Sequence, residues 1–302
     1  MVEELKFKSY DGKELVCYLW DEVANPKGVV QLVHGLTSHA RRYDDFAEVL
    51  NQNGYIVFGD DHRMNGKTAG LENLGKAGYN NFYENVEDEL SISRMLKEKY
   101  KLPLFLFGHS YGSFLTQRYI QMQEGLADAV ILSASAYMGG SKLFLGKVLT
   151  FFQRVFFNVH APGNMFFEMT FSSNDKYFEE DKLKNAWLNR DFEKVRAFNE
   201  DPYCDFVMSH GFFYAMMRGL YDAYRPENLD KIDKNLPILI VSGDKDPLGG
   251  MGEKVKRLYE MYKALGLNVQ MKLYENVRHE LTADFESEKI IGDLVAFFDA
   301  NV

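Results

Sequence analysis

Three side chains in this sequence have the types and the order that nucleophilic acyl transfer requires. Ser110 is the centre of the pentapeptide GHSYG at 108–112, which matches G-x-S-x-G, a motif that places a serine on a sharp turn between a strand and a helix. A serine hydroxyl is a weak nucleophile, so it needs a histidine base that a carboxylate orients. Asp246 and then His279 follow Ser110, and serine, acid, histidine is the chain order that accompanies this motif.

Each of these residues follows a segment that is expected to be a strand. The apolar run before Ser110 is Leu102–Phe107, Asp246 comes after Pro237–Val241, and His279 comes after Val269–Tyr274. Open α/β sheets build their sites at the carboxyl ends of parallel strands, so the three side chains are expected to meet there. His279 is also the only one of the seven histidines that lies downstream of Asp246.

Two further questions concern the groups around this triad. Asp244 directly follows Gly243 and is an alternative acid, but an aspartate in that position commonly shapes the turn, so we favour Asp246. Acyl transfer also needs donors for the developing oxyanion. The backbone N–H groups of Tyr111, after the nucleophile, and of Leu36, in the loop after an earlier strand, are the candidates, and we interpret His34 as a structural support of that loop.

The elements that must hold these residues follow from the hydrophobic pattern of the 302-residue chain. Two alternating segments around Asp11-Gly12 predict an antiparallel hairpin, Leu5–Ser9 with Glu14–Trp20. Further buried strands are predicted at 29–33, 55–58 and 129–132, and amphipathic helices at 42–51, 80–99, 114–123, 252–265 and 284–300. The alternation predicts an α/β fold with a mostly parallel sheet that is flanked by helices.

One long segment without a clear strand interrupts this pattern. We predict an α/β core at 1–134 and 229–302 with a helical cap inserted at 135–228, which contains 14 of the 24 phenylalanines. Stripes at helical spacing run through residues 149, 152, 155 and 156 and through 206, 213, 217 and 220. Most of these side chains are expected to pack the cap onto the core. The rest suit an acyl chain or a membrane or micelle surface, and we predict substrate contacts from Phe152, Phe156, Phe213 and Met217.

Charge and cysteine content narrow the partners and the compartment. The net charge of −9 argues against nucleic acid as a partner. The polar start of the sequence lacks the features of a secretory signal, and Cys17 and Cys204 suit two reduced thiols. We therefore expect a cytoplasmic protein, with no metal and no other cofactor, that acts on a small acyl ester. The sequence leaves the oligomeric state open.

Taken together, the motifs resemble the monoglyceride lipase and lysophospholipase group of α/β-hydrolases. The resemblance rests on His34-Gly35 followed by His39 and Arg42-Tyr43, on Asp61-His62-Arg63 with Gly66, and on the segments GHSYG, GDKDP and RHE around the triad. It implies the α/β-hydrolase fold with a cap over an acyl pocket, Ser110 as nucleophile, Asp246 as acid, His279 as base, and Leu36 and Tyr111 as oxyanion donors.

The predicted reaction is ester hydrolysis through an acyl-enzyme, with monoacylglycerols or lysophospholipids as the substrates that the resemblance and the apolar cap favour. A short-chain carboxylesterase, a thioesterase or a serine aminopeptidase would use the same triad, because the fold does not determine the leaving group. A non-catalytic binding protein on this scaffold would be marked by the loss of a triad member, and the sequence retains all three.

Overall fold

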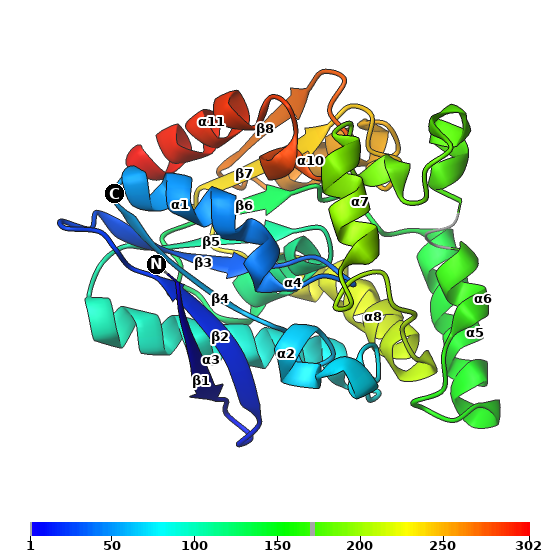
Figure 1. Cartoon of the computed structure of the whole chain (residues 1–302). Helices are drawn as coiled ribbons and strands as arrows, with labels where there is room; N and C mark the ends of the chain where they lie inside the picture. The colour runs from blue at the N-terminus through cyan, green and yellow to red at the C-terminus, as the bar shows by residue number, and fades with distance from the viewer. Residues whose placement is uncertain (1, 170–172) are drawn as a thin grey trace.

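The computed structural model describes residues 2–169 and 173–302 and contains one mixed sheet of eight strands (Figure 1). The strand order is β1-β2-β4-β3-β5-β6-β7-β8. Only β1 with β2 and β2 with β4 pair in the antiparallel sense, and every later pair is parallel. The strands are β1 (Glu3–Lys8), β2 (Glu14–Trp20), β3 (Gly28–Val33), β4 (Tyr55–Asp60), β5 (Leu104–His109), β6 (Ala129–Ser133), β7 (Ile238–Gly243) and β8 (Val269–Tyr274).

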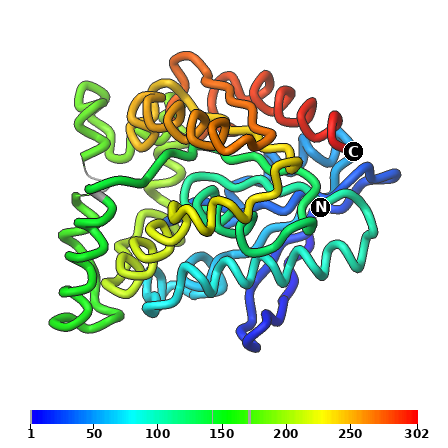
Figure 2. Tube along the Cα trace, turned by 180° about the vertical axis from the view of Figure 1, so that it is seen from behind, coloured from blue at the N-terminus to red at the C-terminus, as the bar shows by residue number. Residues whose placement is uncertain are grey.

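The central strands are continuous apolar runs because helices cover both faces of the sheet. Every residue of β3, β4, β5, β6 and β7 is buried. One face packs on α1 (Asp44–Gln52) and α11 (Ser287–Asp299). The opposite face packs on α3 (Asn81–Tyr100), α4 (Tyr111–Met122) and α10 (Glu253–Ala264), and the two layers are visible in Figures 1 and 2.

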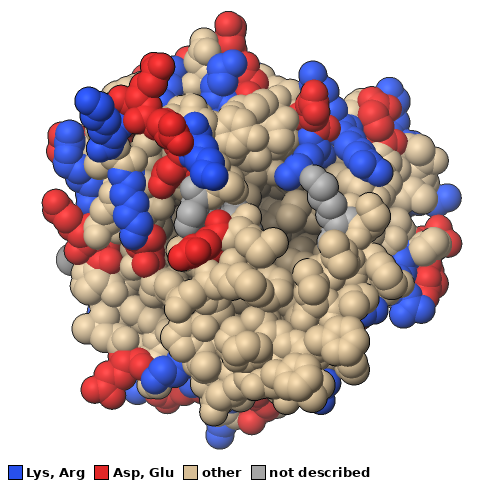
Figure 3. Space-filling view, turned by 90° about the vertical axis from the view of Figure 1, so that its right-hand side faces the viewer, with Lys and Arg blue, Asp and Glu red and all other residues tan. Residues whose placement is uncertain are grey.

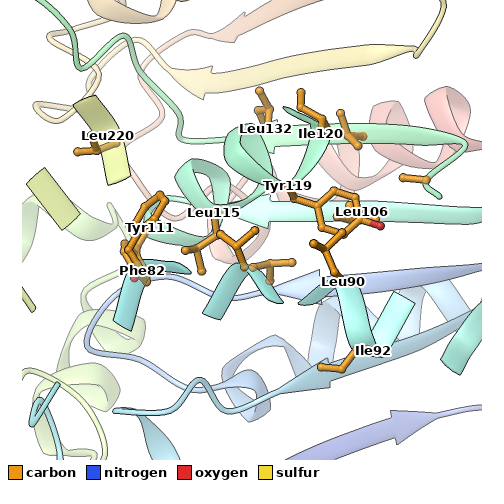
Figure 4. Close-up of a cluster of buried hydrophobic side chains, with 14 of the residues drawn as sticks. Phe82, Leu90, Ile92, Leu106, Tyr111, Leu115, Tyr119, Ile120, Leu132 and Leu220 are labelled. Carbon is orange, nitrogen blue, oxygen red and sulfur yellow. The ribbon is translucent and has the colours of Figure 1, made fainter. Parts of the chain in front are cut away.

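A dense apolar cluster joins α3 and α4 to the middle of the sheet. Leu90 of α3 lies close to Leu115 and Tyr119 of α4 and to Leu106 of β5, and Ile92, on another side of α3, belongs to the same cluster (Figure 4). All five are almost completely inaccessible to solvent. This packing holds the first turn of α4, and therefore the residue before it, firmly against the sheet.

Between β6 and β7 the described residues form helices and one isolated bridge, Pro162 with Ser209. The innermost helix, α8, lies against α3 and α4, and α5 lies outside it at the edge of the molecule (Figures 1 and 2). Phe212, Met216 and Leu220 of α8 belong to the main core. The elements are α5 (Ser141–Phe156), α6 (Asn164–Phe167), η4 (Asp175–Asp181), η5 (Ala186–Leu188), α7 (Phe192–Glu200), α8 (His210–Ala223) and α9 (Pro226–Leu229).

The remaining short helices are η1 (Ala40–Tyr43), α2 (Gly66–Ala69), η2 (Leu71–Asn73) and η6 (Leu281–Ala283). The predicted α/β fold with its N-terminal hairpin is confirmed, and the strands agree with the hydrophobic pattern to within a few residues. The largest helix-start difference near the triad is at α4, which begins at Tyr111 and not at the expected Phe114, because the helix starts directly at the turn that carries Ser110. Among the described helices, none has the length and apolar composition required to cross a bilayer.

Candidate active site

Ser110 occupies a strained turn between β5 and α4. Its φ of 53° and ψ of −116° are uncommon for a residue with a side chain. The Ser110 N–H donates to Ser133 O on β6 at 2.9 Å, and Ser110 O accepts from the Ser113 hydroxyl at 2.6 Å. These bonds, together with the packing of α4, hold the strained conformation and leave the Ser110 side chain at the carboxyl end of the sheet.

The two glycines of the motif allow the strand and the helix to approach closely. A Cβ on Gly112 would lie 2.0 Å from Val33 O, and a Cβ on Gly108 would lie 2.3 Å from Thr116 Oγ1. Neither position can hold a side chain without moving α4 away from the sheet. The motif is therefore a packing requirement of the turn that presents Ser110.

The structure brings Asp246, and not Asp244, to His279. His279 Nδ1–H donates to Asp246 Oδ2 at 2.8 Å, and both side chains are buried. The second oxygen, Asp246 Oδ1, accepts from the Leu248 N–H at 2.9 Å, which fixes the carboxylate. Asp244 Oδ1 accepts from the Asn276 N–H at 2.7 Å and so shapes the turn before His279.

Ser110 and His279 line the same pocket of about 530 Å³. Among the described residues, no hydrogen bond joins the Ser110 hydroxyl to the His279 ring. In free enzymes such hydrogen bonds are commonly long and shorten only when substrate binds. The Trp187 ring packs 4.8 Å and the His109 ring 5.0 Å from the His279 ring, between centroids. Burial, followed by the neighbouring His279, lowers the pKa of His109 well below its ordinary range, so His109 stays neutral beside the base.

The predicted oxyanion donors lie next to Ser110. Leu36 lines the pocket together with Ser110, and a Cβ on Gly35 would lie 3.4 Å from Ser110 Cβ, so the two loops are in contact. Tyr111 is the first residue of α4, and the N–H groups of a first helical turn have no partner within the helix. These N–H groups and the helix dipole favour negative charge at this position.

A second pocket of about 500 Å³ meets the first at Ser110 and Leu36. Its walls are apolar and come from the catalytic turn, from the segment after β6 and from α8. The lining residues are Leu36, Ser110, Tyr111, Phe114, Ala134, Ala136, Met138, Met216, Leu220 and Leu248. Ser110 thus lies at the junction of this apolar pocket and the first pocket, whose lining combines polar and apolar side chains and which we call the polar pocket.

Comparison with known proteins places this site in a family. Residues 24–286 match the family model described as serine aminopeptidase, S33. The chain belongs to this family. Its relatives include a monoacylglycerol lipase of Mycolicibacterium smegmatis, which is 26% identical over 97% of this chain and 96% of its own. The human monoglyceride lipase is 33% identical over 34% of this chain and 33% of its own.

A solved structure similar to this family member is that of a highly thermostable carboxyl esterase from Bacillus coagulans in complex with glycerol. It has a TM-score of 0.87 and 27% identity, and the match covers 99% of this chain and 98% of the esterase. The α/β-hydrolase fold that the family resemblance implies is therefore present along the whole chain.

The structure places the four predicted substrate contacts away from both pockets. Phe152 and Phe156 project from α5 with exposed fractions of 56% and 76%, Phe213 is fully buried in the core, and Met217 packs against Gly146 of α5. Helical spacing identified apolar faces but not the surfaces that they meet. Met216, next to Met217 on α8, lines the apolar pocket instead.

The charged residues in the polar pocket of this family member are already paired. Arg42 Nη1 and Nη2 donate to Glu280 Oε1 and Oε2 at 2.5 and 3.1 Å, and Asp205 forms an ion pair with Lys184. Arg42, Asp205 and Glu280 are the charged residues among those described as lining the pocket. The pocket therefore offers polar groups without an unpaired cation.

Within residues 2–169 and 173–302, two clusters outside the triad contain side chains of metal-ligand type, and neither is arranged as an open set of ligands. In His39, Asp201 and Cys204, His39 Nε2 is hydrogen-bonded to Asp201 at 2.8 Å. Burial raises the pKa of the Cys204 thiol, which therefore keeps its proton. The second cluster, Asp60, His62 and Glu89, is sealed in the core and is already internally bonded.

Proposed function

We propose that this chain hydrolyses monoacylglycerols, with Ser110, Asp246 and His279 as its catalytic triad. The chain is an ester hydrolase. The observation that favours this substrate is that two unlike pockets meet at Ser110. An acyl chain suits the apolar pocket, and a small polyol suits the polar one. The reading is supported by the names of its relatives, which include monoacylglycerol lipases.

The reaction follows from the positions of these groups. Ser110 Oγ attacks the ester carbonyl carbon while His279 takes the hydroxyl proton, and Asp246 stabilises the imidazolium that forms. The N–H groups of Leu36 and Tyr111 donate to the oxyanion. The intermediate then breaks the bond to the alcohol oxygen, which receives the proton from His279 and leaves. A water molecule, deprotonated by His279, attacks the acyl-enzyme and releases the carboxylic acid and Ser110.

The alcohol pocket supports glycerol over a phosphate-bearing or cationic leaving group. A lysophospholipid phosphate would need a free cation, and Arg42 is already bound to Glu280. An aminopeptidase would need a free carboxylate for the substrate ammonium, and Asp205 is paired with Lys184. The carboxyl esterase from Bacillus coagulans was crystallised with glycerol, which agrees with an alcohol of this size.

A substrate panel on the wild type and on Ser110→Ala tests this proposal. We expect the highest kcat/KM on 1-monolauroylglycerol, lower values on lauroyl lysophosphatidylcholine and lauroyl thioester, and no cleavage of amino-acid p-nitroanilides. Ser110→Ala should lose essentially all of the hydrolysis. Activity on acetyl esters with none on glycerides of C8 or longer would contradict the lipase assignment, and unchanged activity in Ser110→Ala would contradict the triad.

We also infer that α5 touches the surface of a membrane or micelle that holds the substrate. Phe144, Phe151, Phe152, Val155 and Phe156 are each more than half exposed. No Asp or Glu occurs from residue 136 to 167, while Lys147 and Arg154 lie on the helix. Figure 3, which faces this side of the molecule, has a broad uncharged area over its lower half beneath a central hollow. An exposed apolar surface of this kind is unusual on a protein that stays in water.

Binding to vesicles tests this contact. The variant Phe152→Ser/Phe156→Ser should bind phosphatidylcholine vesicles containing phosphatidylglycerol at least about tenfold more weakly, since each phenylalanine side chain contributes about 1.5–3 kcal/mol when buried. Hydrolysis of a dissolved short-chain ester should be unchanged. Phe285→Ser is the control, because Phe285 is 69% exposed but lies outside the cap. Equal vesicle binding by the three proteins would exclude the contact.

The compartment that we infer is the cytoplasm. Cys17 and Cys204 are both buried and are not joined by a disulfide, as expected for a protein that folds in a reducing environment. Fractionation of the source cells should recover the chain inside the cell, either free or peripherally bound to membranes. Its recovery from the medium would contradict this inference.

A further inference from the structure

A buried pair of histidines lies directly beneath the loop that carries Leu36. The rings of His34 and His62 stack with their centroids 3.8 Å apart and an interplanar angle of 16°. Both side chains are inaccessible to solvent. His34 directly follows β3, and His62 follows β4, so the pair connects two neighbouring strands at the edge of the sheet where the site lies.

The His34 side chain holds one particular peptide group. His34 Nδ1–H donates to Gly35 O at 2.7 Å. Gly35 O and the Leu36 N–H belong to the same planar trans peptide, so they point in opposite directions. Holding the oxygen therefore also fixes the direction of the Leu36 N–H, and Leu36 and Ser110 line the same pocket.

The backbone of His62 determines the tautomer that this contact needs. His34 Nε2 accepts from the His62 N–H at 3.1 Å, so the ring proton of a neutral His34 must be on Nδ1. Burial, followed by the charge of His62, lowers the pKa of His34 well below its ordinary range. His34 is therefore a neutral ring with its proton directed at Gly35 O.

The His62 ring uses both of its nitrogens as donors. His62 Nε2–H donates to His34 O at 3.2 Å, and Nδ1–H donates to Asp60 Oδ2 at 3.1 Å. Burial alone would lower the pKa of His62, but the Asp60 carboxylate raises it above its usual value. Glu89 lies 3.4 Å from Nδ1, and burial next to Asp60 raises the pKa of Glu89 well above its ordinary range, so Glu89 keeps its proton.

Further buried bonds anchor this pair to the core. Gln31 Nε2–H donates to Glu89 Oε2 at 2.6 Å, and the Ser93 hydroxyl donates to Gln31 Oε1 at 2.5 Å. Tyr119 OH on α4 in turn donates to Ser93 Oγ at 2.9 Å. The network ends at Glu89, whose Oε1 lies 3.4 Å from His62 Nδ1, so these bonds hold the carboxyl group that borders the His62 ring.

We propose that His62 is a positioning residue of the reaction, which acts through His34 to fix the Gly35–Leu36 peptide and so aims the Leu36 N–H at the oxyanion. The inference rests on the proposed function, in which Leu36 supplies one of the two oxyanion donors. It also gives a role to the Asp61-His62-Arg63 segment, which the chemistry of the triad does not use.

A misdirected Leu36 N–H stabilises the transition state less. It leaves substrate binding almost unchanged, because the oxyanion does not exist in the bound ester. Loss of a whole oxyanion donor lowers kcat by about 10²–10³. We therefore expect His62→Gln to lower kcat by about 10–100-fold on a dissolved monoester, with KM within about twofold of the wild type.

The test is a double-mutant cycle of His62→Gln and His34→Gln. Each single variant should lower kcat, and the double variant should lower it little further, because both act on one peptide group. Binding of a trifluoromethyl ketone, which forms an oxyanion on Ser110, should weaken in parallel with kcat. Binding of the non-hydrolysable ether analogue of the substrate should not change.

Arg63→Gln is the matched control. Arg63 is the next residue, but it binds Asp88 at 2.6 and 2.7 Å and Asp11 at 2.6 Å, away from the loop. It should lower the melting temperature while kcat stays within about twofold. Should His62→Gln fail to fold, Asp60→Asn carries the test, because it leaves both rings in place and should still lower kcat with an unchanged KM.

The outcomes distinguish the positioning role of His62 from the proposed function. The inference about His62 would be wrong if the folded His62→Gln variant had the kcat of the wild type. It would also be wrong if the kcat losses of the two single variants multiplied fully in the double variant. In both cases Ser110→Ala would still be inactive. If the Ser110→Ala variant kept the activity of the wild type, the proposed function itself would be wrong.

Discussion

At the scale of single residues, two aspartates two positions apart have different partners. Asp246 accepts from the ring of His279, whereas Asp244 accepts from the backbone of Asn276. The first contact orients the ring of His279, the proposed base, and the second shapes a turn. Their substitution should therefore affect the reaction to very different extents.

We expect Asp246→Asn to lower kcat by about 10⁴, because an amide stabilises the wrong tautomer of His279 and cannot balance an imidazolium. Asp244→Asn keeps an acceptor for the Asn276 N–H and should change kcat by less than about fivefold. Steady-state hydrolysis of a dissolved ester by both purified variants measures this. Similar losses in the two variants would mean that the acid is not uniquely Asp246.

The sequence predicts that these three residues lie close together, because each of them follows a strand. Ser110, Asp246 and His279 follow β5, β7 and β8, and parallel strands end at one edge of the sheet. The sequence predicts that His34 supports its loop, but it does not predict which atoms make the contacts. The partner that orients His34 is 28 residues away in the chain, in the loop after another strand, and no local pattern connects the two.

At the scale of elements, the two apolar stripes of the predicted cap illustrate what periodicity leaves undetermined. The face of α5 that includes Phe152 and Phe156 is exposed, while that of α8 is buried in the main core. Both have the same helical spacing. Which one meets an acyl chain depends on tertiary packing, and Met216 and Leu220 of α8 are the side chains of these helices that reach the apolar pocket.

Met216→Trp should shorten the acyl chain that the enzyme accepts, because the larger ring fills part of the apolar pocket. We expect the ratio of kcat/KM for C14 to that for C4 monoesters to fall at least about tenfold, as one or two lost methylene contacts already cost 1–3 kcal/mol. Met217→Trp is the matched control on the neighbouring position, which lines neither pocket. An equal shift in both variants would indicate a general distortion of α8.

At the scale of the whole molecule, buried neutral histidines make stability depend on pH. His109 and His34 have pKa values well below their ordinary range in the folded state, in both cases first because of burial. Below about pH 6.5 the unfolded chain binds protons that these two residues do not bind when folded. The free energy of unfolding should therefore fall as the pH drops from 6.5 toward the lowered folded-state values.

Each such histidine contributes a slope of about 1.4 kcal/mol per pH unit in that window. His109→Gln should remove the contribution of one histidine to this pH dependence of the free energy of unfolding. The urea denaturation midpoint of the variant should therefore fall less between pH 6.5 and 5 than that of the wild type. His160→Gln, at an exposed position, is the control and should retain the wild-type slope. A steeper slope for His109→Gln would contradict the buried neutral form.

The integration of α8 into the main core also bears on how substrate preference can change by recombination. Because Phe212, Met216 and Leu220 pack with the sheet, the segment between β6 and β7 is not exchangeable as one piece. A chimera that takes residues 139–205 from a relative keeps the native α8 and should fold, whereas one that takes residues 135–228 must match a foreign helix to this core. Exchange of outer cap segments is therefore the less disruptive route to a new surface, while a new chain-length preference requires changes in α8 and its core neighbours together.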